Sequence, residues 1–265
     1  MNTTPRFEAA AAGTTSASPP APVTGRARAR RLVIDAPTRM FHWLFALSFL
    51  GAYLTAESEH WRALHVTLGY TLGGLLVFRL FYGLFGPRQA GLGSLWRRLA
   101  GAPAWLRSAG QAFMLRGERP TVQWGQGRNL LMPMLVLALL ALVLPLTLSG
   151  YASYQEWGDV LGGDLVAELH EFLGNAFLAV VLGHVVLIAG LSLLRRKNHA
   201  LPMLTGRVEG PGPNLVTNNR NWLAVALLMS VLGFGAWQWQ QSPQGLVPGQ
   251  AWAGTASSGE REHDD

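Results

Sequence analysis

Apolar and polar positions along this chain alternate in long blocks. Five blocks are apolar, and each is near the ~20 residues that a helix needs to cross a bilayer; they cover about 40–56, 63–85, 130–148, 165–194 and 222–239. The third holds Pro133 and Pro145, which membrane helices tolerate. The fourth is longer than the bilayer requires, so one of its ends should project beyond the hydrocarbon. We therefore predict an all-α membrane protein with five spans.

Composition supports this prediction and narrows the chemistry. Only 14% of the residues are charged and 49% are hydrophobic, whereas a typical soluble domain has about 25% charged residues. A soluble enzyme is therefore disfavoured. The chain has no cysteine, which excludes disulfides, thiolate metal sites, iron–sulfur clusters and covalently attached c-type haem.

Four segments outside the spans differ from the apolar blocks. Residues 1–31 are rich in Ala, Thr, Ser and Pro, and residues 240–265 are polar, so we expect a disordered tail at each end. The connection 87–128 mixes arginines with large apolar residues. It is either an amphipathic helix on the membrane surface or a plain cytoplasmic loop. A shorter inner loop, from residue 199, leads into the fifth span.

The basic residues are sorted by connection. Of the 21 Lys and Arg residues, all but Arg62, Arg79 and Arg261 lie before the first span or in the 2–3 and 4–5 connections. The segment 151–168 has no base and four carboxylates: Glu156, Asp159, Asp164 and Glu168. The positive-inside rule then predicts that the N-terminus is in the cytoplasm and the C-terminus is on the opposite, outer side of the membrane. This sorting explains the basic composition without a nucleic-acid partner.

Four of the seven histidines fall within or at the ends of spans, where ionisable residues are usually functional. His42 is near the inner end of span 1, and His65 is near the outer end of span 2. On span 4, His170 and His184 are 14 residues apart, which places both on one face and about 21 Å apart along the axis. The depths predict an outer pair, His65 with His170, and an inner pair, His42 with His184.

Each pair can ligate a planar macrocycle held edge-on between two helices, so we predict two bis-histidine b-type haems. Gly69, Gly73, Gly174 and Ala46 follow the ligands by one or two turns and would leave room for the ring, although small residues also serve helix packing. Zinc is the competing ligand, but it usually draws three or four side chains to one point. A lone histidine in a span is more often a packed polar residue or a proton relay. His60, His199 and His263 are expected to be solvated.

Three charged residues near these pairs have two interpretations each. Arg79, four turns beyond His65, either extends to the inner interface or binds a haem propionate, and we include it among the candidate cofactor-binding residues. Glu168 and Glu171 flank His170. They either hydrogen-bond near it or are solvated.

Several strings give the chain a resemblance to a known family: Asp35-Ala-Pro-Thr-Arg-Met-Phe-His42-Trp43, Trp61-Arg-Ala-Leu-His65-Val-Thr-Leu-Gly69, and Phe78-Arg79-Leu-Phe-Tyr-Gly83. They resemble the bacterial cytochrome b561 family, which includes the b-type cytochrome subunits of nickel–iron hydrogenases. The His170/His184 spacing is similar to that in the gamma subunit of formate dehydrogenase. The resemblance covers about 33–198 and implies a four-helix haem-binding bundle in a bacterial inner membrane, so that the C-terminus would be periplasmic. It also implies the same two ligand pairs and electron exchange with quinone. The fifth span is additional.

These features predict a transmembrane electron carrier between an external redox protein, such as a hydrogenase or a c-type cytochrome, and the membrane quinone pool. One alternative is a stand-alone quinone oxidoreductase of the superoxide- or metal-reducing type. Another is a non-haem ion or proton transporter that uses the intramembrane histidines. No catalytic residue is predicted, because the redox chemistry belongs to the cofactor.

Overall fold

The structure is a computed structural model. It describes residues 30–87, 124–155 and 164–242, together with Trp157 and isolated positions between 91 and 107. The main elements are β1 (Arg30–Leu32), α1 (Ala36–Thr55), the 3-10 turn η1 (Glu59–Trp61), α2 (Arg62–Phe85), α5 (Trp124–Tyr154), α7 (Leu165–Arg195), α8 (Leu201–Thr205), β2 (Arg207–Glu209) and α9 (Asn221–Gln241). Each of the five apolar stretches therefore contains a long helix.

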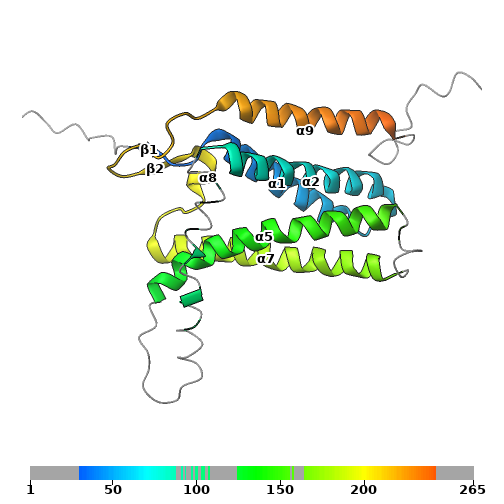
Figure 1. The fold of residues 1–265 in the computed structure, drawn as a ribbon, viewed down its shortest axis with the longest axis horizontal. Helices are drawn as coiled ribbons and strands as arrows, with labels where there is room; N and C mark the ends of the chain where they lie inside the picture. Colours follow the sequence, from blue (N-terminus) through cyan, green and yellow to red (C-terminus); the bar gives the residue numbers. More distant parts are fainter. Residues whose placement is uncertain are drawn as a thin grey trace, which may run out of the picture.

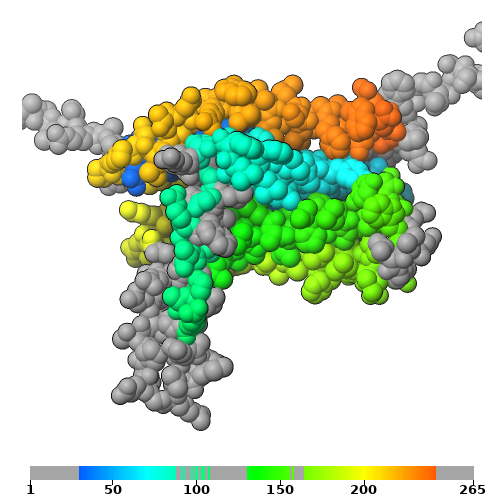
Figure 2. All heavy atoms as spheres, in the orientation of Figure 1, coloured from blue at the N-terminus to red at the C-terminus, as the bar shows by residue number. Residues whose placement is uncertain are grey.

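The long helices run side by side in three layers (Figure 1). Helix α9 lies on one side, α1 and α2 form the middle layer, and α5 and α7 form the other side. Figure 2 shows the same order as successive bands of packed atoms. The strands and α8 gather at one end of the bundle, which we call the strand end; η1 lies at the opposite end, which we call the cavity end.

Four helices are long and apolar enough to cross a membrane: the helical segment Glu59–Phe85 and helices α5, α7 and α9. Helix α1 has 20 residues but is not among them, because Arg39 and His42 lower the hydropathy of its first turns. A fifth span thus remains a prediction. Helix α7 has 31 residues, about 46 Å at 1.5 Å per residue, so it exceeds the bilayer core as its sequence indicated.

One apolar core joins the first four long helices. It is formed by Phe49 of α1, Leu72 and Leu76 of α2, Val143 and Leu146 of α5, and Leu173 and Phe177 of α7. Val143 and Phe177 are completely buried. A second cluster, Phe41, Leu75 and Leu227, attaches α9 to α1 and α2. The bundle therefore has a four-helix core with α9 docked on its surface.

The start of α1 is held by a buried carboxylate. Asp35 is the N-cap and accepts a hydrogen bond from the Thr38 amide at 3.2 Å, and Pro37 lies in the first turn, where it removes no helical bond. Asp35 is only 2% exposed, and its other oxygen accepts a hydrogen bond from the Tyr82 hydroxyl. This contact joins the first turn of α1 to the last turn of α2.

The strand end has more structure than the sequence indicated. Strands β1 and β2 pair antiparallel, with Arg31 opposite Val208, so the predicted tail is wrong at residues 30 and 31. The Gly206 carbonyl accepts from the amides of Val33 and Ile34 at 2.8 and 3.1 Å. The partners are more than 170 residues apart, and no local pattern could show this pairing. Residues 1–29 and 243–265 lie outside the described residues, as does most of 87–128.

Candidate functional site

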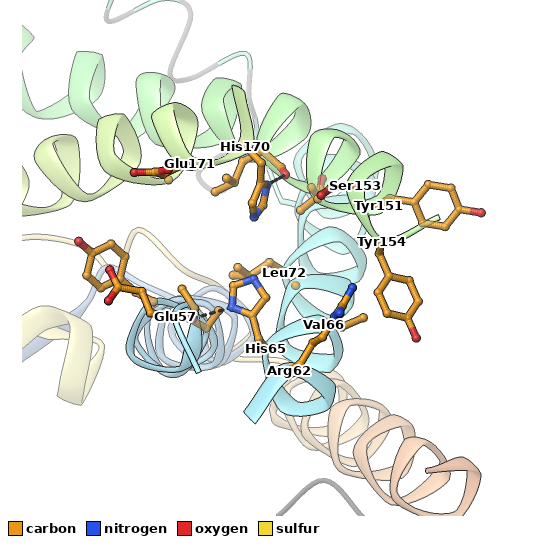
Figure 3. A pocket seen from close by; sticks show the side chains of 18 of the residues that line it. Glu57, Arg62, His65, Val66, Leu72, Tyr151, Ser153, Tyr154, His170 and Glu171 are labelled. Atoms are coloured by element: carbon orange, nitrogen blue, oxygen red, sulfur yellow. Dashed lines mark hydrogen bonds between the residues drawn. The ribbon is translucent and has the colours of Figure 1, made fainter. Parts of the chain in front are cut away.

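A cavity of about 750 Å³ opens at the cavity end between α1, α2, α5 and α7 (Figure 3). Its size is within the range of small-molecule and cofactor sites, about 300–1,000 Å³. Its deeper wall is apolar and includes Phe49, Leu72 and Leu146. Its mouth is polar and is lined by residues of η1 and the adjoining turns. A ligand with an apolar body and a charged edge would suit this arrangement.

His65 of α2 and His170 of α7 point into the cavity from opposite sides (Figure 3). We call them the cavity-end pair. Their ring centroids are 6.1 Å apart, and the ring planes are at 87° to each other. The spacing of the two imidazoles leaves a slot between them.

Each ring of the cavity-end pair is held by a backbone carbonyl. His65 Nδ1 is 2.8 Å from the Ala52 carbonyl oxygen, and His170 Nδ1 is 3.1 Å from that of Leu146. Because a carbonyl oxygen only accepts, each Nδ1 carries the proton and each Nε2 keeps its lone pair. Metal-ligating histidines are typically oriented in this way. Both rings are therefore in the tautomer that can ligate through Nε2.

A glycine of α5 gives His170 its room. A Cβ added at Gly150 would lie 2.7 Å from His170 Cε1, too close for any side chain. The neighbouring Ser149 hydroxyl is 3.2 Å from His170 Nδ1. We did not predict a role for either residue from the sequence. The signal was present as a small, polar Ser-Gly pair near the outer end of an apolar stretch.

Two further glycines line the cavity and leave it open. A Cβ at Gly69 would meet nothing within 4 Å, and one at Gly174 would meet only Leu146 Cδ1, at 4.0 Å. Gly73 differs, because its Cβ would touch Thr147 of α5 at 3.9 Å. Gly69 and Gly174 thus open space beside the cavity-end pair, whereas Gly73 serves helix packing.

His42 of α1 and His184 of α7 form the strand-end pair, which is close enough for the two imidazoles to interact electrostatically. The Nδ1 atom of each is buried and has no hydrogen-bond partner in the part of the chain that the structure describes. Buried polar atoms normally have partners. A bound group in the space around these rings would explain why the two buried Nδ1 atoms lack hydrogen-bond partners among the described residues.

An aromatic layer separates the two pairs. Phe177 follows His170 by seven residues and precedes His184 by seven, and it is completely buried. Its ring centroid is 4.5 Å from that of Phe49 and 6.1 Å from that of Phe45, both on α1. The two pairs are therefore separate sites at different depths.

The remaining histidines differ from one another. His60 is exposed in η1. His199 is half-buried, its Nε2 is buried without a partner among the described residues, and its amide donates to the Ser192 hydroxyl at 3.0 Å. The expectation that His199 is solvated is therefore wrong, because the chain folds back onto the end of α7. His263 lies outside the described residues.

The charged candidates are placed as follows. Arg79 is half-buried and lies within electrostatic range of Asp35 and Tyr82, an interaction that neither interpretation of its sequence position included. Glu168 and Glu171 are exposed, and Glu171 lines the cavity. The hydrogen bonds of His170 go to α5.

Among the described residues, no group of three or more His, Cys, Asp or Glu side chains could hold a metal ion. Each pair supplies two imidazoles, fewer than the three or four protein ligands that zinc sites usually have. The two imidazoles of a pair can complete the coordination of an iron atom whose other four ligands come from a macrocycle.

Together, the helices define an all-α membrane bundle with two pairs of histidines on its facing helices. Residues 33–206 match the family model described as prokaryotic cytochrome b561. The match covers well over half of the chain, and the protein therefore belongs to this family. It is a multi-pass membrane protein. Its family implies electron transfer through b-type haem. No curated protein and no solved structure matches the chain.

The cavity-end residues fit a b-type haem. At a metal–nitrogen distance of about 2.0–2.1 Å, imidazoles on opposite faces of one metal ion have ring centroids about 6 Å apart, close to the observed 6.1 Å. Both Nε2 atoms are available, and Gly69 leaves open space beside them. The haem of such a site is non-covalent, as the absence of cysteine requires.

Proposed function

We propose that the protein holds two b-type haems and carries electrons across the membrane between an external redox protein and the quinone pool. The cavity-end pair, His65 and His170, would ligate one haem, and the strand-end pair, His42 and His184, the other. The observation that carries the proposal is the orientation of the cavity-end rings, each bound through Nδ1 to a backbone carbonyl. The buried, unpartnered Nδ1 atoms of the strand-end pair support the second site.

Each haem would supply a one-electron ferric/ferrous couple. The chain sets the axial ligands, excludes water and fixes the spacing. His170 and His184 lie about 21 Å apart along α7 at 1.5 Å per residue. The two sites would therefore occupy different depths of the membrane, with the Phe177 layer between them.

The charges at the cavity end indicate which kind of external redox protein would bind there. Exposed carboxylates gather at the cavity end: Glu57, Glu59, Asp164, Glu168 and Glu171. Such a surface favours a positively charged redox protein, of the hydrogenase or c-type cytochrome kind. Quinone would react near the strand-end pair, an assignment that rests on family likeness. Arg79 could bind a propionate of that haem in addition to its interaction with Asp35.

Haem content tests the proposal directly. His65→Ala and His184→Ala should each leave one haem per chain, and the double variant should leave none, because one lost imidazole opens one axial position. The measurement is the pyridine haemochrome of the purified protein against its concentration. His60→Ala is the matched control, since His60 is exposed in η1, and it should keep two haems. Two haems in the double variant would contradict the ligand assignment.

A stand-alone quinone oxidoreductase is a second candidate, because the cavity reaches the surface beside exposed Glu57 and Glu59. A small oxidant or reductant could then reach the cavity-end haem without a docked protein. Purified protein should in that case transfer electrons from superoxide to a soluble quinone at a rate unaffected by added redox protein. A rate that depends on an added c-type cytochrome or hydrogenase favours the carrier.

A further inference from the structure

We propose that Arg62 is the anion-binding residue of the cavity-end site and pairs with a propionate carboxylate of the haem between His65 and His170. The proposal rests on the function proposed above. It assigns a binding role to Arg62, which with Arg261 of the tail is one of two basic residues that the sequence places on the acidic side of the membrane.

Arg62 is well placed for this role. It begins α2 and precedes His65 by three residues, so both side chains lie on one face of the helix. It lines the cavity (Figure 3). The first turn of a helix also presents unpaired amides and a positive partial charge, which favours anions.

The charges around the cavity single out Arg62. Among the described residues that line the cavity, Arg62 is the only Lys or Arg, whereas Glu57, Glu59 and Glu171 line it as carboxylates. Without Arg62, a haem propionate would meet only like charge at the mouth. Arg62 therefore provides a positive charge in an otherwise acidic mouth, at the point where the ligand's carboxylates would emerge.

The guanidinium of Arg62 is available for such a contact. Its ion pair with Glu59 is long, with 4.0 Å between Nη1 and Oε2, and the two side chains are 60% and 88% exposed. Exposed ion pairs of this kind contribute little to the free energy of folding. A rearrangement toward a ligand carboxylate would therefore sacrifice little stability.

The cavity walls decide which edge of the haem faces Arg62. Phe49, Leu72 and Leu146 form the deeper wall, and an unpaired carboxylate against that wall would be strongly unfavourable. A macrocycle held edge-on between His65 and His170 must therefore turn its propionates to the mouth. Arg62 would then fix its rotation about the axis between the two rings.

The first experiment reconstitutes the haem-free full-length protein with haem and with its dimethyl ester, which lacks the carboxylates. Wild type should bind haem more tightly than the ester at both sites. Arg62→Gln should weaken haem binding at one site by roughly two- to fivefold, as expected for a largely exposed ion pair. It should leave ester binding unchanged, and Arg62→Lys should recover most of the loss.

The second experiment is a redox titration of the reconstituted variants. A nearby positive charge favours ferrous haem, so Arg62→Gln should lower the midpoint potential of one haem only. Glu171→Gln, at the same mouth, should raise the potential of that haem. Loss of haem and ester binding alike, or equal shifts of both haems, would overturn the role of Arg62. If wild type, purified before any haem is removed or added, shows no Soret band, the proposed function itself fails.

Discussion

The cavity-end histidines are oriented by groups that no sequence pattern identifies, namely the carbonyl oxygens of Ala52 and Leu146. The lack of a side chain at Gly150 is equally important, because a Cβ there would lie only 2.7 Å from the His170 ring. The orientation of this histidine pair thus depends on backbone atoms and on the lack of a side chain at Gly150 as much as on the imidazoles.

Gly69→Ala separates haem fit from helix packing. Its Cβ would meet no atom within 4 Å, and Ala favours a helix over Gly by about 0.5–1 kcal/mol. The variant should therefore fold at least as well as wild type, yet bind the cavity-end haem more weakly, because the methyl group enters the cavity. The measurements are far-UV circular dichroism and the haem-to-protein ratio.

Gly74→Ala is the matched control, on the same helix and also with nothing within 4 Å, but outside the cavity lining. It should keep both haems. Full haem content in Gly69→Ala would show that the macrocycle does not lie against α2 at this position.

At the scale of elements, the strand end attaches the segment after α7 to the start of α1. The Arg39 guanidinium donates to the Leu204 carbonyl at 2.9 Å, and the Trp43 indole donates to that of Met203 at 3.2 Å. His42 lies between these two anchored residues. The position of the strand-end pair therefore depends on α8 and β2 as well as on α1 and α7.

Gly206→Ala tests this dependence. Gly206 ends α8 at φ +74°, and a Cβ there would lie 2.7 Å from the Ile34 carbonyl oxygen. A left-handed L-residue alone costs about 1–2 kcal/mol, and the contact adds to it. The variant should lower the thermal stability of haem absorbance and preferentially lose the strand-end haem.

Gly233→Ala on α9 is its control, since its Cβ would meet nothing within 4 Å and its φ is helical. If Gly206→Ala lost the cavity-end haem first, the anchoring of the strand-end pair by α8 would be wrong.

At the scale of the whole molecule, the two ends carry opposite chemistry. The cavity end has the exposed carboxylates, and the strand end has Arg30, Arg195, Arg196, Lys197 and Arg207. Of the acidic loop that the sequence indicated, Asp164 and Glu168 are described and exposed, whereas Glu156 and Asp159 lie outside the described residues. The molecule is therefore polarised along the axis of its helices.

Docking at the cavity end should depend on salt. Changing Glu57, Asp164 and Glu168 together to amides should slow electron exchange with a positively charged c-type cytochrome roughly tenfold at low ionic strength, the lower end of electrostatic steering. The salt dependence should flatten while haem content stays the same. Glu209→Gln, at the strand end, is the control; identical salt profiles in both variants would remove the acidic end from docking.

The orientation of the ends can be measured with reporters. A reporter active only in the periplasm should be active when fused after Trp252 and silent when fused after Arg207, because the basic connections favour the cytoplasm. The opposite pattern would reverse both the topology and the side on which the external partner docks.

Much of this architecture was determined by local sequence. A helix needs only a run of apolar residues of sufficient length, and each of the five stretches forms one. The pairing of His65 with His170 was predicted from sequence as well, because both residues lie near the outer ends of their apolar stretches, and helical geometry places His170 and His184 on one face of their helix. The structure brings the His65 and His170 rings to 6.1 Å, and the family match supports the haem chemistry.

Only the tertiary structure decided the rest, because it depends on contacts between residues distant in the chain. The β1–β2 pairing, the buried Asp35–Tyr82 contact and the placement of His199 join segments whose own patterns say nothing about each other. The same is true of Gly150 against His170 and of Arg62 at the mouth of the cavity. Hydropathy and helical periodicity specify which faces of helices are buried, but not which backbone atoms and charges they meet there.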